Sequence, residues 1–229
     1  MPSLTRADDV FVLDLGDDEN RFSLDWIAEV AGALDEVAQA EGARALVTTA
    51  RGKIYSNGLD LDWLRAQDEE QLAGYVVAVH EVFARLLELP VPTVAAVPGH
   101  AFAAGGMFAL AHDFRVMRAD RGWFCLPEVD LGIPFTDGMA ALIQARLTPQ
   151  VAHEVMTTGR RYGGVEAHSL QIVDLAVPED DVVPTALKLA ADLAPKAGAT
   201  LGRIKTTMYG TTLARLRDTE ADVTLGGLH

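Results

Sequence analysis

The chain has 229 residues, of which 49% are hydrophobic, 23% charged and 7% aromatic. This is the composition of a folded globular protein, and it excludes global disorder. Nineteen basic against thirty-three acidic side chains give a net charge of −14, which argues against a nucleic-acid partner and against binding to an anionic membrane surface.

Strands and helices alternate along the first two thirds of the chain. Short apolar runs predict strands, and apolar residues at a spacing of three or four predict helices. In chain order we expect a strand over 10–15, a helix over 22–40, a strand over 45–49, a loop over 51–60, a helix over 69–89, a strand over 93–97, a loop over 99–106 that opens a helix ending near 112, a strand over 114–118, a short strand over 123–126, helices over 137–146 and 149–158, and a strand over 172–177. This alternation indicates an α/β fold.

Two further features bear on the organisation of the chain. Residues 1–180 are predicted to form an α/β core with the active site, and 181–229 a helical region without a strand partner, which caps the site or packs on another subunit. The 24 residues 89–112 carry no Asp, Glu, Lys or Arg, enough to span a bilayer. Three prolines and three glycines divide this stretch, so we interpret it as a strand, a loop and a helix start, and expect no membrane span.

Two glycine-containing loops each follow a buried strand. In the first, residues 53–60, Gly58 permits a sharp turn and Asp60 is placed to cap the next helix. The second, residues 99–106, is rich in glycine and alanine, so a ligand can approach its backbone. Each loop alone is equally well explained as a tight, well-packed turn. Together they predict two unpaired backbone N–H groups at one site, the arrangement of an oxyanion hole.

A third loop, residues 123–134, carries Glu128 among bulky apolar neighbours. Burial in such surroundings raises the pKa of a carboxyl group and suits it to proton transfer. The alternative is a surface glutamate that caps a neighbouring turn.

The single cysteine, Cys125, excludes a disulfide framework and favours a reducing, cytoplasmic compartment. No metal-ligand spacing, phosphate loop or dinucleotide fingerprint is present, so we expect neither a metal nor a separate cofactor.

These three loops, in this order and spacing, resemble those of the crotonase superfamily, also called the enoyl-CoA hydratase/isomerase family. The resemblance rests on Ser56-Asn57-Gly58-Leu59-Asp60, on Pro98-Gly99-His100-Ala101 followed by Ala103-Ala104-Gly105-Gly106, and on Pro127-Glu128-Val129-Asp130-Leu131-Gly132. It covers roughly residues 10–208. It implies a spiral of ββα units with a helical C-terminal region, an acyl-CoA thioester substrate, and homotrimers or dimers of trimers.

The resemblance also assigns roles by position. The N–H donors would be those of Leu59 and Ala104. Of the two glutamates that the family's hydratases use, one position is occupied here by Met107 and the other by Glu128. The substrate-binding residues would be Arg51, Lys53, Ser56, Asn57, Gly58, Ala103, Gly105 and Met107, together with Lys205, which would reach the nucleotide phosphate from its own or a neighbouring subunit.

The loss of one carboxylate separates the possible reactions. Hydration requires a water molecule held between two acid–base groups, whereas moving a double bond from position 3 to position 2 requires a single base and no water. We therefore favour a Δ3-Δ2-enoyl-CoA isomerase. The alternatives are another reaction on the same fold, such as hydration, thioester hydrolysis or decarboxylation, and a non-catalytic acyl-CoA-binding subunit.

Overall fold

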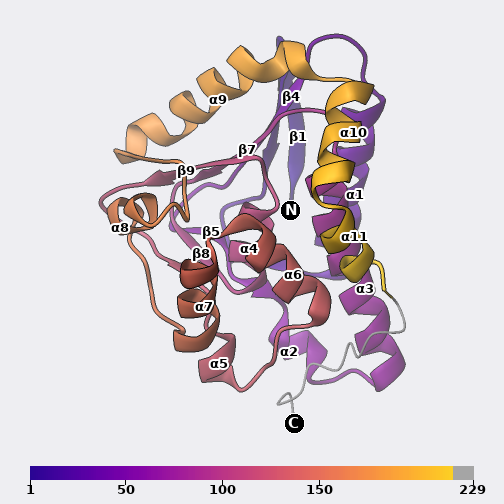
Figure 1. The fold of residues 1–229 in the computed structure, drawn as a ribbon, viewed down its shortest axis with the longest axis vertical. Helices are drawn as coiled ribbons and strands as arrows, with labels where there is room; N and C mark the ends of the chain where they lie inside the picture. The colour runs from indigo at the N-terminus through magenta and orange to yellow at the C-terminus, as the bar shows by residue number, and fades with distance from the viewer. Residues whose placement is uncertain (219–229) are drawn as a thin grey trace.

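A six-stranded sheet runs through the molecule in the order β1-β2-β4-β7-β9-β11 (Figure 1). The computed structural model describes residues 1–218. Only the β1–β2 pair is antiparallel, and the other neighbours are parallel. The strands of this sheet are β1 (Ser3–Ala7), β2 (Val10–Asp14), β4 (Ala45–Thr49), β7 (Thr93–Val97), β9 (Phe114–Arg118) and β11 (Leu175–Val177).

Short strands form two smaller sheets beside the main one. One has the order β10-β8-β5, and β3 pairs with β6 in the other. Their bounds are β3 (Arg21–Phe22), β5 (Ile54–Ser56), β6 (Gly58–Leu59), β8 (His100–Phe102) and β10 (Phe124–Cys125). Each of β4, β7 and β9 is therefore followed by a short strand of the second sheet and then by a helix. This repetition is the ββα spiral that the resemblance to the crotonase superfamily implies.

The helices occur in the remaining segments. They are α1 (Leu24–Gln39), α2 (Leu61–Leu64), α3 (Glu69–Glu88), α4 (Ala104–Leu110), α5 (Glu128–Leu131), α6 (Asp137–Arg146), α7 (Pro149–Thr158), α8 (Gly164–Ser169), α9 (Val182–Leu193), α10 (Ala199–Met208) and α11 (Gly210–Leu216), with short 3-10 helices at η1 (Glu179–Asp181) and η2 (Ala194–Lys196). Side-chain caps fix several starts: Ser23 accepts from the backbone N–H of Trp26, and Asp68 and Gln71 form a capping box at α3.

The two faces of the main sheet pack against different helices. In β4, Leu46 contributes to the large core beneath α1, α3 and α4, whereas its neighbours Ala45 and Val47 pack with Ala186 and Ala190 of α9. Successive residues of a strand point to opposite faces, so a buried run such as 45–49 serves both layers. Figure 1 shows α9 apart from the other helices, on its own side of the sheet.

The C-terminal helices pack within this chain. α9 covers one face of the sheet, and α10 and α11 lie against α3, with α11 also against α6 (Figure 1). The helical region predicted over 181–229 therefore completes the core of the same chain as far as it is described, and residues 219–229 lie outside the described residues. Because packing on a distant strand or helix is a tertiary event, the sequence could not assign these partners.

Several short elements are missing from the sequence-based expectation. β1 is absent from it because its five residues are mostly exposed and polar, without an apolar alternation. The expected loops over 51–60 and 99–106 contain β5, β6 and β8, strands of two or three residues that exist through pairing with distant segments.

None of the helices within residues 1–218 is long and apolar enough to cross a membrane, and the uncharged stretch 89–112 is divided among β7, β8 and α4.

Candidate active site

The three loops meet around one cavity of about 300 Å³. It opens where β5 and β8 end and α4 and α5 begin. Apolar side chains and backbone make up most of its wall. Its lining residues are Ile54, Asn57, Leu59, Leu61, Phe102, Ala103, Ala104, Met107, Pro127, Glu128, Leu131, Ile133, Pro134 and Met139. The structure thus brings together the first, second and third loops, which lie up to 70 residues apart in the sequence.

The first two loops approach one another at backbone distance. Gly58 has a φ of +79°, and a Cβ on it would lie 2.7 Å from the backbone nitrogen of Ala104. A Cβ on Gly105 would lie 2.4 Å from the carbonyl oxygen of Ser56. Only glycine fits at either position. These contacts place Leu59, which follows Gly58, and Ala104 on the same cavity wall.

Ser56 does not line the cavity: it is fully buried, and its hydroxyl group bonds to the backbone. Its Oγ donates to the carbonyl oxygen of Asn20 at 2.8 Å and accepts from the N–H of Gly58 at 3.0 Å. Ser56 therefore holds the turn that presents the N–H of Leu59.

The second loop carries local backbone strain. Ala103 has a φ of +50° and a ψ of −127°, a conformation that is sparsely populated for residues with a Cβ. Its N–H donates to the carbonyl oxygen of Cys125 at 2.9 Å, which ties the second loop to β10. Ala104 is the first residue of α4, so its N–H has no carbonyl acceptor one turn earlier in the helix.

Glu128 enters the cavity from the start of α5, directly after Pro127. Its side chain is 6% exposed, and Oε2 is buried without a hydrogen-bond partner in the described chain. Burial without compensation raises the pKa of this carboxyl group to about 7. At neutral pH the group is therefore balanced between its acid and base forms, as a group that both removes and returns a proton must be.

Met107 lies across the same cavity on α4, 1% exposed. It is an apolar group at the position where the family's hydratases carry their other glutamate. Among the described residues that line the cavity, Glu128 is the only one with a titratable side chain. Within residues 1–218 no group of three or more His, Cys, Asp or Glu side chains is arranged to hold a metal ion.

The basic residues expected to bind substrate are less well placed. Arg51 and Lys53 are exposed and lie outside the cavity lining, and Arg51 is paired with Asp14 at 2.8 Å. Lys205 is 3% exposed; its ammonium group lies 2.6 Å from Asp113 and donates to the carbonyl oxygen of Val91 at 2.8 Å. Because this group is already committed inside the core, the structure does not present Lys205 to a phosphate.

A cluster of cations that the sequence analysis missed lies beside Lys53. The N–H of His100 donates to the carbonyl oxygen of Lys53 at 2.9 Å. Arg121 and Arg161 both lower the pKa of His100, after burial, and Arg161 lies 5.7 Å from the ring centre of Phe102, which lines the cavity. The side chains of Lys53, Arg121 and Arg161 form no ion pair with a carboxylate within the described chain. We call Lys53, Arg121 and Arg161 the cationic rim.

No sequence pattern predicts this rim, because its members come from distant segments. A two-way backbone pair between Phe124 and Tyr162, each N–H donating to the other's carbonyl oxygen at 2.9 Å, brings Arg161 next to β10. No motif contains residue 161, and an isolated bridge of this kind has no sequence pattern.

Two candidates that the sequence disfavours are buried away from the cavity. His112 bonds to Thr48 Oγ1 at 2.9 Å through Nε2 and to the carbonyl oxygen of Phe108 at 2.8 Å through Nδ1. Burial lowers its pKa to about 3, so it stays neutral. Burial likewise raises the pKa of Cys125 to about 11, which keeps it a thiol rather than a nucleophilic thiolate.

Comparison with known proteins shows the family of the chain. The family model for enoyl-CoA hydratase/isomerase matches residues 6–225. The chain is 38% identical over 219 residues to enoyl-CoA delta isomerase 3 of Arabidopsis thaliana and 39% identical over 223 residues to the peroxisomal enoyl-CoA delta isomerase 2 of the same plant; each match covers 91% of this chain and 92% of the relative. Among solved structures, human mitochondrial delta3-delta2-enoyl-CoA isomerase superposes with a TM-score of 0.86 at 27% identity, covering 94% of this chain and 85% of the human one.

Proposed function

Because the chain belongs to the enoyl-CoA hydratase/isomerase family, we propose that it is an enoyl-CoA isomerase that moves the double bond of a 3-enoyl-CoA to position 2. The observation that carries this proposal is the pairing of one buried carboxyl group, Glu128, with an apolar residue, Met107, across an apolar cavity. The isomerase names of two relatives at 38% and 39% identity support the same choice.

The proposed reaction is a proton transfer between two carbons of one substrate. Ionised Glu128 removes a proton from C2 of the 3-enoyl thioester. The electron pair of that C–H bond forms a C1–C2 double bond, and the π electrons of the carbonyl group move to the thioester oxygen, which gives a dienolate with double bonds at C1–C2 and C3–C4. The negative charge on the oxygen then returns through the conjugated carbons of the acyl group, the C2–C3 double bond forms, and Glu128 delivers its proton to C4. The product is the 2-enoyl thioester, and no water, oxidant or metal ion is consumed.

The N–H groups of Leu59 and Ala104 stabilise the thioester oxygen in this scheme. Fixed donors directed at developing charge in a dry cavity are among the strongest catalytic contributions. Replacing Ala104 by proline removes one donor at the first helical position, where proline is tolerated. We expect kcat to fall by about 10²–10³ in a variant whose circular dichroism is unchanged. Full activity in a folded Ala104→Pro variant would exclude the second loop from the mechanism.

Met107 disfavours hydration in this cavity. A water molecule that adds to a double bond must be oriented and deprotonated, and two acid–base groups serve this in a hydratase. Here one polar anchor is replaced by a buried thioether. The isomerisation needs no second group, because the acid formed in the first step is the donor in the second.

The cationic rim is a suitable contact for the phosphates of the CoA group. A protein with a net charge of −14 repels an anion unless the charge near its site is positive. Lys53, Arg121 and Arg161 provide such charge beside Phe102, which lines the cavity. Within the proposed function, the rim takes the part that the sequence analysis gave to Lys205.

The function is tested with 3-enoyl-CoA substrates of graded chain length, by following the conjugated 2-enoyl product and identifying it by mass spectrometry and chromatography. Substrate deuterated at C2 should give product with part of the label at C4, because one carboxyl group carries the proton. Formation of a 3-hydroxyacyl-CoA or of free CoA would replace the proposal by hydration or hydrolysis. Binding without turnover of any 3-enoyl-CoA would indicate an acyl-CoA-binding subunit.

We also propose that the chain forms a homotrimer or a dimer of trimers in the cytoplasm. Supporting the assembly, α10 presents Ile204 and Met208, which are 50% and 66% exposed, and large apolar groups in such positions are typical of contact surfaces. Sedimentation equilibrium at micromolar concentration tests the assembly, and a monomer would contradict it. Fluorescence microscopy of the tagged chain tests the compartment.

A further inference from the structure

Asn20 lies beneath the first site loop, in a segment outside all three motifs. It is 2% exposed and has a φ of +48°, in the left-handed region that asparagine tolerates better than most residues. Its own N–H donates to Asp18 Oδ1 at 2.7 Å, which fixes the turn. A buried polar side chain in this conformation has to be stabilised by what it contacts.

The side chain and backbone of Asn20 bind the site loop at three points. Nδ2 donates to the carbonyl oxygens of Ile54 at 3.2 Å and Tyr55 at 3.1 Å, and the carbonyl oxygen of Asn20 accepts from Ser56 Oγ at 2.8 Å. Ser56 Oγ in turn accepts from the N–H of Gly58 at 3.0 Å. Each contact acts on the loop within four residues of Gly58.

Other residues of segment 16–20 also hydrogen-bond to the first site loop and to Arg51, which lies just before it. The N–H of Asn57 donates to the carbonyl oxygen of Glu19 at 3.0 Å, and that of Arg51 to the carbonyl oxygen of Gly16 at 2.7 Å. A Cβ on Gly16 would lie 2.8 Å from Oδ1 of Asn20, so glycine is needed there for the amide to fit. Segment 16–20 therefore lies along the loop and matches its shape.

The amide of Asn20 has one workable orientation. Two carbonyl oxygens face Nδ2, so a group without hydrogens in that place would meet like partial charges. Oδ1 is buried without a partner in the described chain. The side chain thus keeps an unsatisfied acceptor inside the protein in order to donate twice to the loop.

We infer that Asn20 is a positioning residue, which sets the conformation of residues 54–58 and thereby the direction of the Leu59 N–H. The inference rests on the proposed function, in which that N–H stabilises the thioester oxygen. It assigns Asn20 no contact with the substrate. A displacement of the donor of the order of 1 Å is expected to cost about 10²-fold in rate.

The main test replaces Asn20 by glycine, which retains the left-handed backbone and removes only the amide group. We expect kcat for a 3-enoyl-CoA to fall about 10- to 100-fold, with little change in KM because the cavity and the cationic rim remain. Asn20→Asp, which keeps the size and loses the donors, should show the same loss. Asp8→Gly is the matched control, because Asp8 also has a positive φ of 53° but lies in the exposed β1–β2 turn.

A spectroscopic signal separates positioning from simple loss of stability. Acetoacetyl-CoA absorbs in the near ultraviolet as its enolate, so a working pair of N–H donors should enhance that band on binding. At saturating acetoacetyl-CoA, Asn20→Gly should show a weaker band than the wild type and the Asp8→Gly control. An unchanged band together with unchanged kcat would overturn the inference.

A second measurement stands apart from the proposed function. Amide hydrogen exchange of the peptide that covers residues 54–60, without substrate, should be faster in Asn20→Gly than in Asp8→Gly. Unchanged exchange in a folded Asn20→Gly variant contradicts the inference even if the protein catalyses another reaction. Lack of isomerase activity in the wild type, with faster loop exchange in the variant, contradicts the proposed function alone.

Discussion

Two buried regions on either side of α4 differ in whether a buried ionisable side chain has a partner. At its N-terminal end, Glu128 is buried in an apolar cavity, and Oε2 has no partner among the described residues. Beyond its C-terminal end, Lys205 is equally buried but lies 2.6 Å from Asp113. The pKa of the unpaired Glu128 carboxyl group is raised to about 7. In the region around Lys205, by contrast, each buried basic side chain of the described chain has an acceptor.

The paired region is extensive. Arg146 donates to the carbonyl oxygens of Leu110, His112 and Asp113 at 2.9, 2.7 and 2.9 Å. Arg115 donates to the carbonyl oxygen of Ile172 at 2.8 Å. Burying a charge is tolerated when hydrogen bonds and an opposite charge replace water. Burial alone therefore does not identify a functional group, whereas burial without a partner in a cavity does.

The largest expected effect tests the lone carboxyl group. Glu128→Gln keeps shape and hydrogen bonding but removes basicity, so turnover of a 3-enoyl-CoA should fall by about 10²–10⁴. Substrate should still bind, because the Leu59 and Ala104 N–H groups and the cationic rim are unchanged. Steady-state kinetics and calorimetric titration measure the two quantities. Near wild-type isomerisation would remove Glu128 from the mechanism and return attention to hydrolysis or binding alone.

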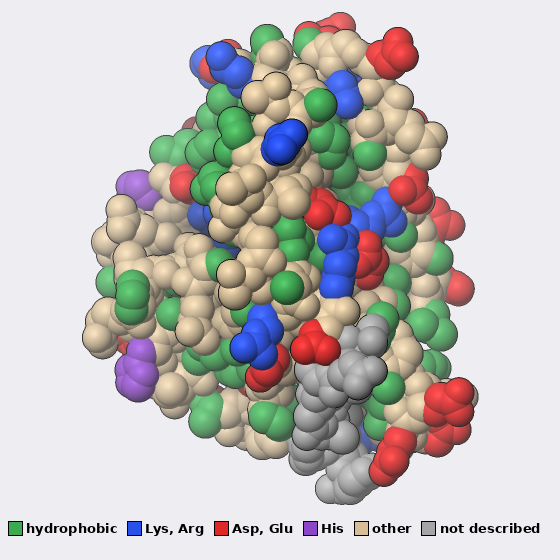
Figure 2. Space-filling model, turned by 45° about the vertical axis from the view of Figure 1, so that its right-hand side comes forward, with side chains coloured by type: hydrophobic (Ala, Val, Ile, Leu, Met, Phe, Trp, Pro, Cys, Tyr) green, Lys and Arg blue, Asp and Glu red, His purple; other side chains and the backbone are tan. Residues whose placement is uncertain are grey.

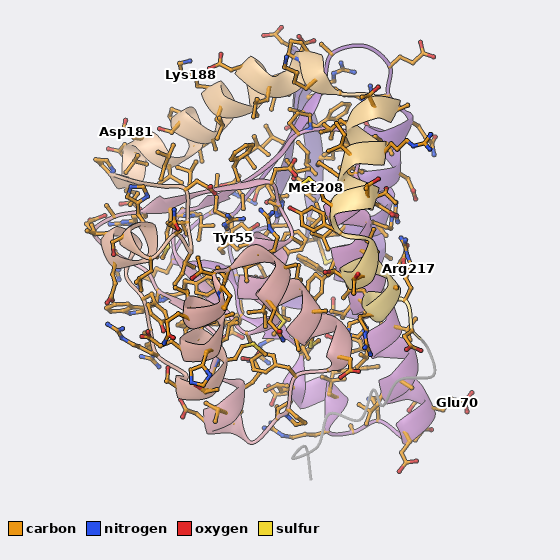
Figure 3. All side chains as sticks on the ribbon, in the orientation of Figure 1. Tyr55, Glu70, Asp181, Lys188, Met208 and Arg217 are labelled. Carbon is orange, nitrogen blue, oxygen red and sulfur yellow. The ribbon has the colours of Figure 1, made fainter. Side chains whose placement is uncertain are left out.

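Substitutions in the region around Lys205, where the buried basic side chains are paired, should change stability rather than the rate. Lys205→Met removes the ion-pair partner of the partly buried Asp113 and leaves it the N–H of Thr93 as a donor, so it should lower the free energy of unfolding by about 1–3 kcal/mol, with kcat per folded molecule unchanged. Lys188→Met is the matched control, because Lys188 is exposed and points outward from α9 (Figure 3); its loss should cost under about 1 kcal/mol. Urea denaturation compares them. Equal effects of the two variants would contradict the distinction.

The pKa of Glu128 predicts two pH dependences of opposite sign. Proton removal needs the ionised form, so kcat/KM should rise with pH with a midpoint near 7. Stability should change the other way: folding raises this pKa, so the contribution of the neutral group is complete at low pH and is lost as pH rises through about 7.

Thermal denaturation provides the check on the second dependence. Above pH 7 the Glu128→Gln variant should unfold at a higher temperature than the wild type, because it buries no charge. A rate that is constant on both sides of pH 7, or a variant that loses stability at high pH, would contradict the assigned pKa.

The smallest expected effect concerns surface charge. The face in Figure 2 shows Lys and Arg side chains directly beside Asp and Glu, whereas Arg161 of the cationic rim forms no ion pair with a carboxylate among the described residues. Arg161→Gln should raise KM for a CoA substrate about two- to fivefold at low salt, less at high salt, with kcat unchanged. Arg160→Gln is the control, because Arg160 is already paired with Glu154 at 2.6 Å. Identical KM values for the two variants would exclude Arg161 from substrate binding.

Much of the candidate site could be predicted from the sequence where function depends on local backbone chemistry. Gly58 and Gly105 mark close approach of two loops, and Asp60 accepts from the N–H of Trp63 at 3.4 Å, as a helix cap should. The apolar surroundings of Glu128 predict a raised pKa. The helices over 137–146 and 149–158 follow from spacing and caps, and both are confirmed.

Other features were set by contacts between distant segments. Lys205 has an ordinary surface spacing in the sequence but is buried, because α10 packs against α3 and brings it to Asp113. Tyr55 lies in the interior near α4 (Figure 3), where its ring centre is 6.1 Å from that of Phe108. The partners in these contacts are far apart in the sequence, so no local sequence pattern predicts them.

The sequence by itself determined the order of the longer strands and helices, the three site loops and the identity of the one retained carboxyl group. Those depend on hydrophobic periodicity, glycine geometry and residue type, which are local properties. The tertiary structure decided which cations are free, what holds the first loop in place, and that Glu128 lacks a partner. Burial and pairing are relations between segments far apart in the chain, so they exist only once the fold brings those segments together.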